Sequence, residues 1–270
     1  MHENAFPTMG FVVEGLRKMG LTLVLIEGDA DDTRVWEQHL DDHVQACLMT
    51  HVYSNTGVVS PVEEIARLCK QNGIFACVDV AQSVGIVPAD PQGWCVDALF
   101  GSCVKWLCGG PGAGYLWVDP EHAEALDATT IGWFSHENPF EFDIRNFRAA
   151  SGARKFWGGT PSVAPYALAA GSLKTLSEIG FDRIRDHNLN LKTIALKGFE
   201  GHGLTARPAT VSGGTLCLNL TGLQADKLAE RLTDDNCHFD RRGNSLRLSF
   251  HIYNTEAEAE FLNQVLNSAL

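Results

Sequence analysis

The sequence has 270 residues, 45% hydrophobic and 20% charged, which is long and apolar enough for one large domain or two smaller ones. Its 33 acidic and 21 basic side chains leave a formal net charge of −12, which argues against nucleic acid or an anionic membrane surface as a partner. The sequence contains neither the long apolar run of a membrane span nor a signal-peptide pattern. Eight cysteines without a C-x-x-C pair favour a reduced protein, and we expect a cytoplasmic location.

The first half of the chain alternates between helix-like and strand-like segments. We expect a helix over 10–19 and strands over 21–27, 44–53, 74–80, 97–103 and 114–118. The run Ser60-Pro61-Val62-Glu63 predicts the start of a helix capped by Ser60, and Gly73 predicts its end. This spacing predicts an α/β fold with a mainly parallel sheet and flanking helices.

The second half of the chain predicts long helices followed by a small mixed unit. We expect helices over 162–179, 181–201, 225–232 and 255–270, and strands over 215–220 and 245–250. Thr255 with Glu258 is typical of a capping box. We therefore expect a large domain over 1–160, and a connecting helix with a small C-terminal α+β domain over 161–270.

Two opposite charges follow predicted strands of the first half. Asp79 ends one strand, and Lys105, with glycines close behind it, follows another. Ligands of parallel sheets bind beyond the carboxyl ends of the strands. A buried lysine can be a neutral nucleophile toward a carbonyl, and a carboxylate can keep a pyridine nitrogen protonated. The pair therefore suits pyridoxal phosphate, although a solvated Lys105 and a helix-capping Asp79 are the alternative.

Several short motifs follow one another from near the start of the chain to near its end. They are Asn4-Ala5-Phe6-Pro7-Thr8, Thr50-His51-Val52 with Thr56-Gly57, Asp79-Val80-Ala81-Gln82-Ser83, Lys105-Trp106-Leu107-Cys108-Gly109-Gly110-Pro111-Gly112, Gly132-Trp133-Phe134-Ser135-His136, Gly159-Thr160-Pro161, and Arg247-Leu248-Ser249-Phe250 with Tyr253-Asn254-Thr255. In this order they resemble the motifs of class V aminotransferase-like, fold-type-I pyridoxal-phosphate enzymes, and most closely those of kynureninases.

The resemblance implies a role for each matching residue. Lys105 would form the Schiff base with the cofactor and move a proton, Asp79 would pair with the ring nitrogen, and Arg247 would bind the substrate carboxylate. The other implied cofactor contacts are Phe6 on the ring face, Thr8 and Thr50 by hydrogen bonds, Gln82 beside the ring, and Trp133 and Thr160 at the phosphate, reaching over from a partner subunit. Without the resemblance, Phe6 and Trp133 are equally well explained by packing, and Arg247 by a surface position.

The resemblance also implies an activity. A kynureninase-like hydrolase would cleave L-kynurenine to anthranilate and L-alanine, using a small amino-acid substrate and acting as a homodimer. An aminotransferase or cysteine desulfurase-like enzyme of the same class is the first alternative. The second alternative is a truncated remnant of the fold without catalytic activity.

Three positions depart from the kynureninase pattern. Met9 stands where the family has Asp, Gln82 replaces a histidine beside the ring, and Val104 replaces the tyrosine before the lysine. Kynureninases also carry a phosphate-binding segment ahead of the Phe-Pro-Thr motif, and this sequence begins just before that motif. These departures keep both alternatives open.

Three other candidate sites are weaker. His39 and His43 have helical spacing for metal ligands, but the aspartates between them favour a solvated helix end. The glycine cluster over 110–114 does not have the G-x-G-x-x-G spacing of a dinucleotide-binding loop. Cys237 lies in a short polar run, and we expect a structural role for it rather than sulfur transfer.

Overall fold

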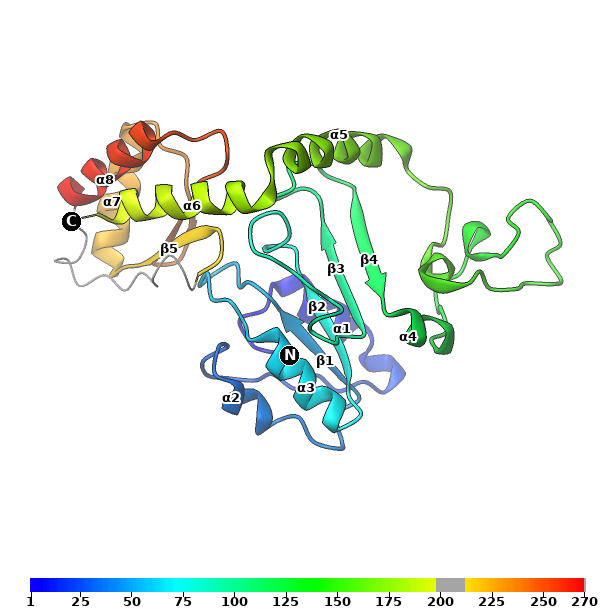
Figure 1. The fold of residues 1–270 in the computed structure, drawn as a ribbon. Helices are drawn as coiled ribbons and strands as arrows, with labels where there is room; N and C mark the ends of the chain where they lie inside the picture. The colour runs from blue at the N-terminus through cyan, green and yellow to red at the C-terminus, as the bar shows by residue number, and fades with distance from the viewer. Residues whose placement is uncertain (198–211, 270) are drawn as a thin grey trace.

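The protein is described by a computed structural model that covers residues 1–197 and 212–269. Two β-sheets are joined by two long helices, α5 (Val163–Ile179) and α6 (Phe181–Leu196), which run end to end across the molecule (Figure 1). The first sheet belongs to the N-terminal part of the chain, and the second to the C-terminal part. The predicted division at residue 160 falls just before α5 and stays a prediction.

The first sheet has four strands in the order β1-β2-β3-β4. They are β1 (Ala46–Thr50), β2 (Phe75–Asp79), β3 (Ala98–Ser102) and β4 (Gly114–Val118). The first three strands are parallel, and β4 is antiparallel to β3. The predicted α/β fold with a mainly parallel sheet is therefore confirmed. The antiparallel β4 follows from the tight loop over 103–113, which is too short for a crossover helix.

Helix α3 (Val62–Gln71) forms because its apolar residues recur at helical spacing. Val62, Ile65 and Cys69 are buried in one core cluster with Trp36 of the short helix α2 (Thr33–Glu37). The chain leaves the helix through Gly73 at φ +67°, as predicted. The predicted cap at Ser60 is wrong, because the Ser60 hydroxyl donates to the carbonyl oxygen of Thr50 at 2.8 Å and the helix begins only at Val62.

The N-terminal segment differs from the sequence-based prediction. The expected helix over 10–19 is displaced: helix α1 spans Pro7–Gly15, and a 3-10 turn, η1, spans Arg17–Met19. The expected strand over 21–27 is wrong, since within the described residues this run makes only an isolated bridge between Ile26 and His2. Leu21, Val24 and Leu25 are exposed. An apolar run becomes a strand only where another strand can satisfy its backbone groups, and none pairs with it in the described chain.

The second sheet has three antiparallel strands in the order β5-β7-β6. They are β5 (Thr215–Asn219), β6 (Asp240–Arg242) and β7 (Ser245–Ser249), and they pack with α6, α7 (Gly222–Asp234) and α8 (Glu256–Ala269). The predicted small α+β unit matches these elements. The Thr255 and Glu258 capping box is confirmed, because the Thr255 N–H donates to Glu258 Oε2 at 2.6 Å. Helix α6 ends before the predicted residue 201, which lies outside the described residues.

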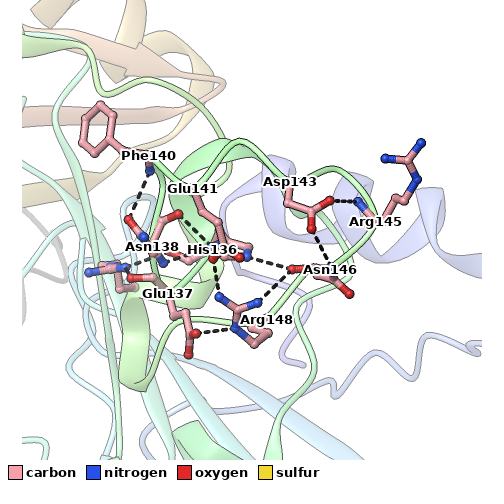
Figure 2. A network of polar contacts seen from close by, with 10 residues as sticks. His136, Glu137, Asn138, Phe140, Glu141, Asp143, Arg145, Asn146 and Arg148 are labelled. Atoms are coloured by element: carbon pink, nitrogen blue, oxygen red, sulfur yellow. Dashed lines mark hydrogen bonds and ion pairs between the residues drawn. The ribbon is translucent and has the colours of Figure 1, made fainter.

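A long extension leaves the first sheet between α4 (Pro120–Ala125) and α5, and contains the 3-10 turns η2 (Trp133–Ser135) and η3 (Gly152–Phe156). Figure 1 shows this extension reaching away from both sheets. Arg148 organises its tip through ion pairs with Glu137 and Glu141 (Figure 2). Among the residues that the structure describes, no helix has the length and apolar character needed to cross a membrane.

Candidate cofactor and substrate site

Two polar side chains lie side by side at the carboxyl ends of parallel strands. Thr50 of β1 and Asp79 of β2 are register partners, and Asp79 is only 6% exposed. The Asp79 carboxylate accepts the backbone N–H of Ala81 at 2.8 Å. The buried hydroxyl of Thr50 has no hydrogen-bond partner among the described residues. This edge of the sheet therefore holds a buried carboxylate and an unsatisfied hydroxyl, where a bound ligand would be expected.

Lys105 lies in the loop that follows β3, and this loop is tightly fixed. The Gly109 N–H donates to the carbonyl of Cys103 at 2.7 Å, which closes the loop on itself. A Cβ on Gly109 would lie 2.7 Å from the Cβ of Cys103, so the close approach requires glycine. From α5, the Ser172 hydroxyl donates to the carbonyl of Leu107 at 2.6 Å. The loop thus presents Lys105 from a rigid support.

A cavity of about 430 Å³ brings Lys105 together with residues from distant parts of the chain. Its lining residues are Phe6, Gln82, Lys105, Trp106, Cys108, Thr215, Arg242, Arg247, Ser249, His251 and Tyr253. The Lys105 ammonium lies 5.4 Å from the centre of the Phe6 ring. We call this space the Lys105 cavity.

The charges around this cavity act on one another. Burial lowers the pKa of Lys105, the positive charges of Arg247 and Arg242 lower it further, and the Asp79 carboxylate partly opposes them. Burial raises the pKa of Asp79, and the Ala81 hydrogen bond and the Lys105 charge oppose that rise. The lysine is thus biased toward a neutral, nucleophilic amine, and the carboxylate lacks a full counter-charge.

These residues fit pyridoxal phosphate. A neutral amine at Lys105 can attack the aldehyde of the cofactor, and a protonated ring nitrogen would supply the positive charge that buried Asp79 lacks. The unsatisfied Thr50 hydroxyl is a further hydrogen-bonding group on the same edge. Three groups carry this fit: the amine of Lys105, the carboxylate of Asp79 and the hydroxyl of Thr50. All three lie at or just after the ends of neighbouring strands β1, β2 and β3.

The structure brings together some of the predicted site residues and separates others. Phe6, Gln82, Lys105 and Arg247 line the Lys105 cavity. Thr50 and Asp79 do not line it, but they are register partners at the sheet edge, and the charge of Asp79 reaches Lys105. Thr8 is exposed on α1 and does not line the cavity. Trp133 and Thr160 are exposed on the extension, where Trp133 borders a different cavity, of about 310 Å³. The predicted roles of these residues stay predictions.

Two features of the cavity were not predicted from the sequence. Arg242 lines it together with Arg247, although the sequence shows Arg242 only as part of a polar run. Three rings stack along one side: Trp106 and His251 lie 5.7 Å apart at 19°, and His251 and Tyr253 lie 5.3 Å apart at 18°. Once the pairing of β6 with β7 is known, strand alternation places Arg242 on the same face as Asp240, the register partner of Arg247.

The weaker candidate sites have ordinary surroundings. His39 contacts the carbonyl of Val35 at 2.9 Å, and His43 is exposed. Within residues 1–197 and 212–269, no three His, Cys, Asp or Glu side chains are arranged to hold a metal ion. Cys237 is half-buried against the core of the C-terminal unit. The glycine cluster over 110–114 leads into β4.

The sequence matches the family model "Aminotransferase class-V" over residues 14–262, so the chain belongs to the class V aminotransferase family. Membership supports the predicted cofactor, pyridoxal phosphate. The chain is 32% identical over 228 residues to an uncharacterized aminotransferase, YcbU, of Bacillus subtilis, covering 83% of this chain and 59% of that protein. It is 30% identical over 187 residues to a kynureninase of Deinococcus radiodurans, covering 69% of this chain and 45% of that enzyme. The chain thus spans about half the length of these relatives.

Solved structures share the fold. A cysteine desulfurase of Thermococcus onnurineus matches with a TM-score of 0.84 at 22% identity, covering 99% of this chain and 71% of that one. The C-DES protein, described as a cystine C–S lyase, matches in a mutant form with a TM-score of 0.86 at 19% identity, covering 100% of this chain and 74% of that one. At these identities the comparisons establish the fold alone. The resemblance read from the motifs is thereby confirmed at the level of the family and its fold.

Proposed function

We propose that this chain provides the cofactor and substrate site of a pyridoxal-phosphate enzyme that hydrolyses L-kynurenine to anthranilate and L-alanine. The observation that carries the proposal is the meeting of Lys105 and Arg247 in one cavity, beside the buried carboxylate of Asp79. The kynureninase relatives support the reaction. Tyr253, which lies at the end of the ring stack and is 73% exposed, supports an aromatic substrate side chain, since its ring offers an accessible flat surface in the cavity.

Each residue then has a chemical task. When bound, pyridoxal phosphate supplies a ring that withdraws electrons from the substrate Cα. Asp79 would pair with the protonated ring nitrogen of the cofactor, and Arg247 would hold the substrate carboxylate in a two-pronged hydrogen-bonded pair. Lys105 would take the proton from the substrate Cα at Nζ, and the burial that lowers its pKa favours the neutral form that this role needs. Water would add to the carbon of the side-chain ketone and leave its oxygen there as part of the new carboxylate. When the bond from that carbon to Cβ breaks, its electron pair goes to Cβ, which takes up a proton and becomes the methyl group of L-alanine.

Purified protein incubated with pyridoxal phosphate tests the proposal. Borohydride should attach the cofactor to Lys105, detected by peptide mass spectrometry, and the Lys105→Arg variant should remain unlabelled. Addition of L-kynurenine should release anthranilate, measured by its fluorescence. A labelled protein that releases no anthranilate would remove the substrate assignment. An unlabelled, colourless protein would favour the remnant without catalytic activity.

A second candidate is an aminotransferase or cysteine desulfurase-like activity at the same site. The observation that favours it is the match to an uncharacterized aminotransferase, which covers more of this chain than the kynureninase match does. The glutamine at Gln82 and the valine at Val104 also depart from the kynureninase pattern. Assays for keto-acid formation from L-kynurenine and for sulfide release from L-cysteine distinguish these activities from hydrolysis.

We further propose that the active form is a homodimer in which the extension of one subunit contributes Trp133 and Thr160 to the other. The extension exposes Phe140, Phe142 and Ile144, the last at 94%, and a second copy of the chain would cover such side chains. Light scattering after size-exclusion chromatography tests this assembly. The Ile144→Asp variant should shift the protein toward monomer.

A further inference from the structure

One carboxylate contacts both arginines of the Lys105 cavity. Arg247 donates from Nη1 to Asp240 Oδ2, and Arg242 Nε lies 3.3 Å from the same oxygen. The Arg247 side chain is 11% exposed, the Arg242 side chain 37% and the Asp240 side chain 53%. The three side chains therefore form a charged cluster in which Arg247 and Arg242 line the cavity and Asp240 contacts both arginines from outside the lining.

Strand pairing explains why these three side chains meet. In β6 and β7, Asp240 is the register partner of Arg247. Alternate residues of a strand share a face, so Arg242 lies on the same face as Asp240, two residues earlier. The opposite face of β7 carries the buried Leu246 and Leu248, which belong to the core of the C-terminal unit. Hydrophobic burial on one face thus fixes the register that builds the charged cluster on the other.

Arg242 is held in place from a second direction. Its Nη1 donates to the hydroxyl of Ser54 at 2.8 Å, and Ser54 is buried in the N-terminal part of the chain. Its charge also acts inside the cavity, because Arg242, like Arg247, lowers the pKa of Lys105. Arg242 is therefore a fixed cation of the site rather than a freely moving surface side chain.

The charges of the cluster suit a substrate with one acid group. Two guanidinium groups and one carboxylate leave one positive charge, which a single substrate carboxylate would balance. A substrate with a second acid group would bring another negative charge toward the arginines that Asp240 already contacts, and like charges at short range oppose binding. We propose that Asp240 is a specificity-determining residue, which restricts the cavity to amino acids whose side chain carries no acid group. This inference rests on the proposed function, since it assumes that the cavity binds an amino acid.

The test compares an acidic with a neutral amino acid in the cofactor-loaded protein. L-aspartate and L-alanine are titrated separately, and the absorbance change of the bound cofactor gives a Kd for each. Asp240→Asn should lower the ratio of the aspartate Kd to the alanine Kd by about tenfold or more, because it removes the opposing charge. Asp226→Asn is the matched control. Asp226 pairs with Arg241 at 2.7 Å, and Arg241, unlike Arg242 and Arg247, does not line the cavity.

The outcomes separate the two proposals. A lowered ratio in Asp240→Asn with an unchanged ratio in Asp226→Asn supports the inference. An unchanged ratio in Asp240→Asn, in a protein that still binds L-alanine and melts like the parent, overturns the inference and leaves the proposed function standing. If neither amino acid alters the cofactor spectrum in the parent protein, both proposals fail. Arg242→Gln adds a second check, because it should raise the Kd for both amino acids.

Discussion

The ammonium of Lys105 lies 5.4 Å from the centre of the Phe6 ring, so the N-terminal segment forms one wall of the cavity. Phe6 is 39% exposed, so part of its ring is accessible to a ligand. A bound cofactor ring would share this aromatic surface. The geometry therefore places Phe6 where it can contact a bound cofactor, which its position near the start of the chain does not by itself predict.

Phe6→Leu should weaken binding of pyridoxal phosphate about two- to tenfold, the usual range for the loss of one aromatic contact. Equilibrium titration followed by cofactor fluorescence measures the Kd. Phe11→Leu is the control, because Phe11 is exposed on α1 and does not line the cavity. Equal Kd values in both variants would contradict the assignment of Phe6 to the cofactor.

The pH dependence of cofactor capture should report the lowered pKa of Lys105. Only the neutral amine attacks the aldehyde, so the capture rate should rise with pH and reach half its maximum below 10.5, the ordinary lysine value. Arg242→Gln should move this midpoint to higher pH, because a removed cation no longer disfavours the ammonium. Stopped-flow absorbance measures the rate. Arg241→Gln, outside the cavity, should leave the midpoint in place.

Asp79→Asn should stabilise the protein when no cofactor is present. The folded-state pKa of Asp79 is raised, so the folded protein binds its proton more tightly than the unfolded chain does. The parent therefore loses stability as pH rises above the ordinary value of 3.8, and Asp79→Asn does not. We expect a higher Tm for the variant at pH 7, and a difference that shrinks toward pH 4.

Cofactor addition should reverse this order, because a protonated ring nitrogen stabilises the carboxylate and not the amide. Differential scanning fluorimetry with and without pyridoxal phosphate makes both measurements. Asp127→Asn is the control, because Asp127 lies in the segment after α4 and does not line the cavity. A Tm of Asp79→Asn equal to that of the parent in both conditions would show that the carboxylate neither lacks a counter-charge nor meets the cofactor.

Hydrophobic periodicity predicted most of the fold. The strand over 114–118 and the helix over 162–179 agree with β4 and α5 to within a residue, since glycines and a serine mark their ends. The strand over 21–27 failed for a physical reason. Periodicity reports which residues are apolar, but a strand also needs a neighbour, and Leu21 and Val24 are instead exposed.

The candidate site was predictable only in part. Asp79 and Lys105 could be found because both follow strand ends, where parallel sheets bind ligands. Arg242 could not be found, since its place in the cavity depends on the antiparallel register of β6 with β7 and on Ser54 from far along the chain. Tyr253 was part of a recognised motif, but its stacking on His251 required the structure.

Two glycines near the Lys105 loop should respond oppositely to alanine. A Cβ on Gly109 would lie 2.7 Å from the Cβ of Cys103 and 3.0 Å from that of Ala169, so Gly109→Ala forces the loop away from α5. Overpacking of this kind costs about 1–3 kcal/mol of unfolding free energy. Gly171, within α5, has no atom within 4 Å of a built Cβ. Gly171→Ala should stabilise the protein by about 0.5–1 kcal/mol, because alanine favours the helix.

Urea unfolding followed by circular dichroism measures both changes, and cofactor capture adds a second readout. Gly109→Ala should also slow the capture of pyridoxal phosphate, because the loop that presents Lys105 shifts with it. Gly171→Ala should leave capture unchanged, since its Cβ would contact nothing in that loop. If Gly109→Ala were as stable as the parent and captured the cofactor at the parent rate, the loop would not need the close approach at Gly109. In that case the position of Lys105 would depend on the other residues that line the cavity and not on the packing of its loop against α5.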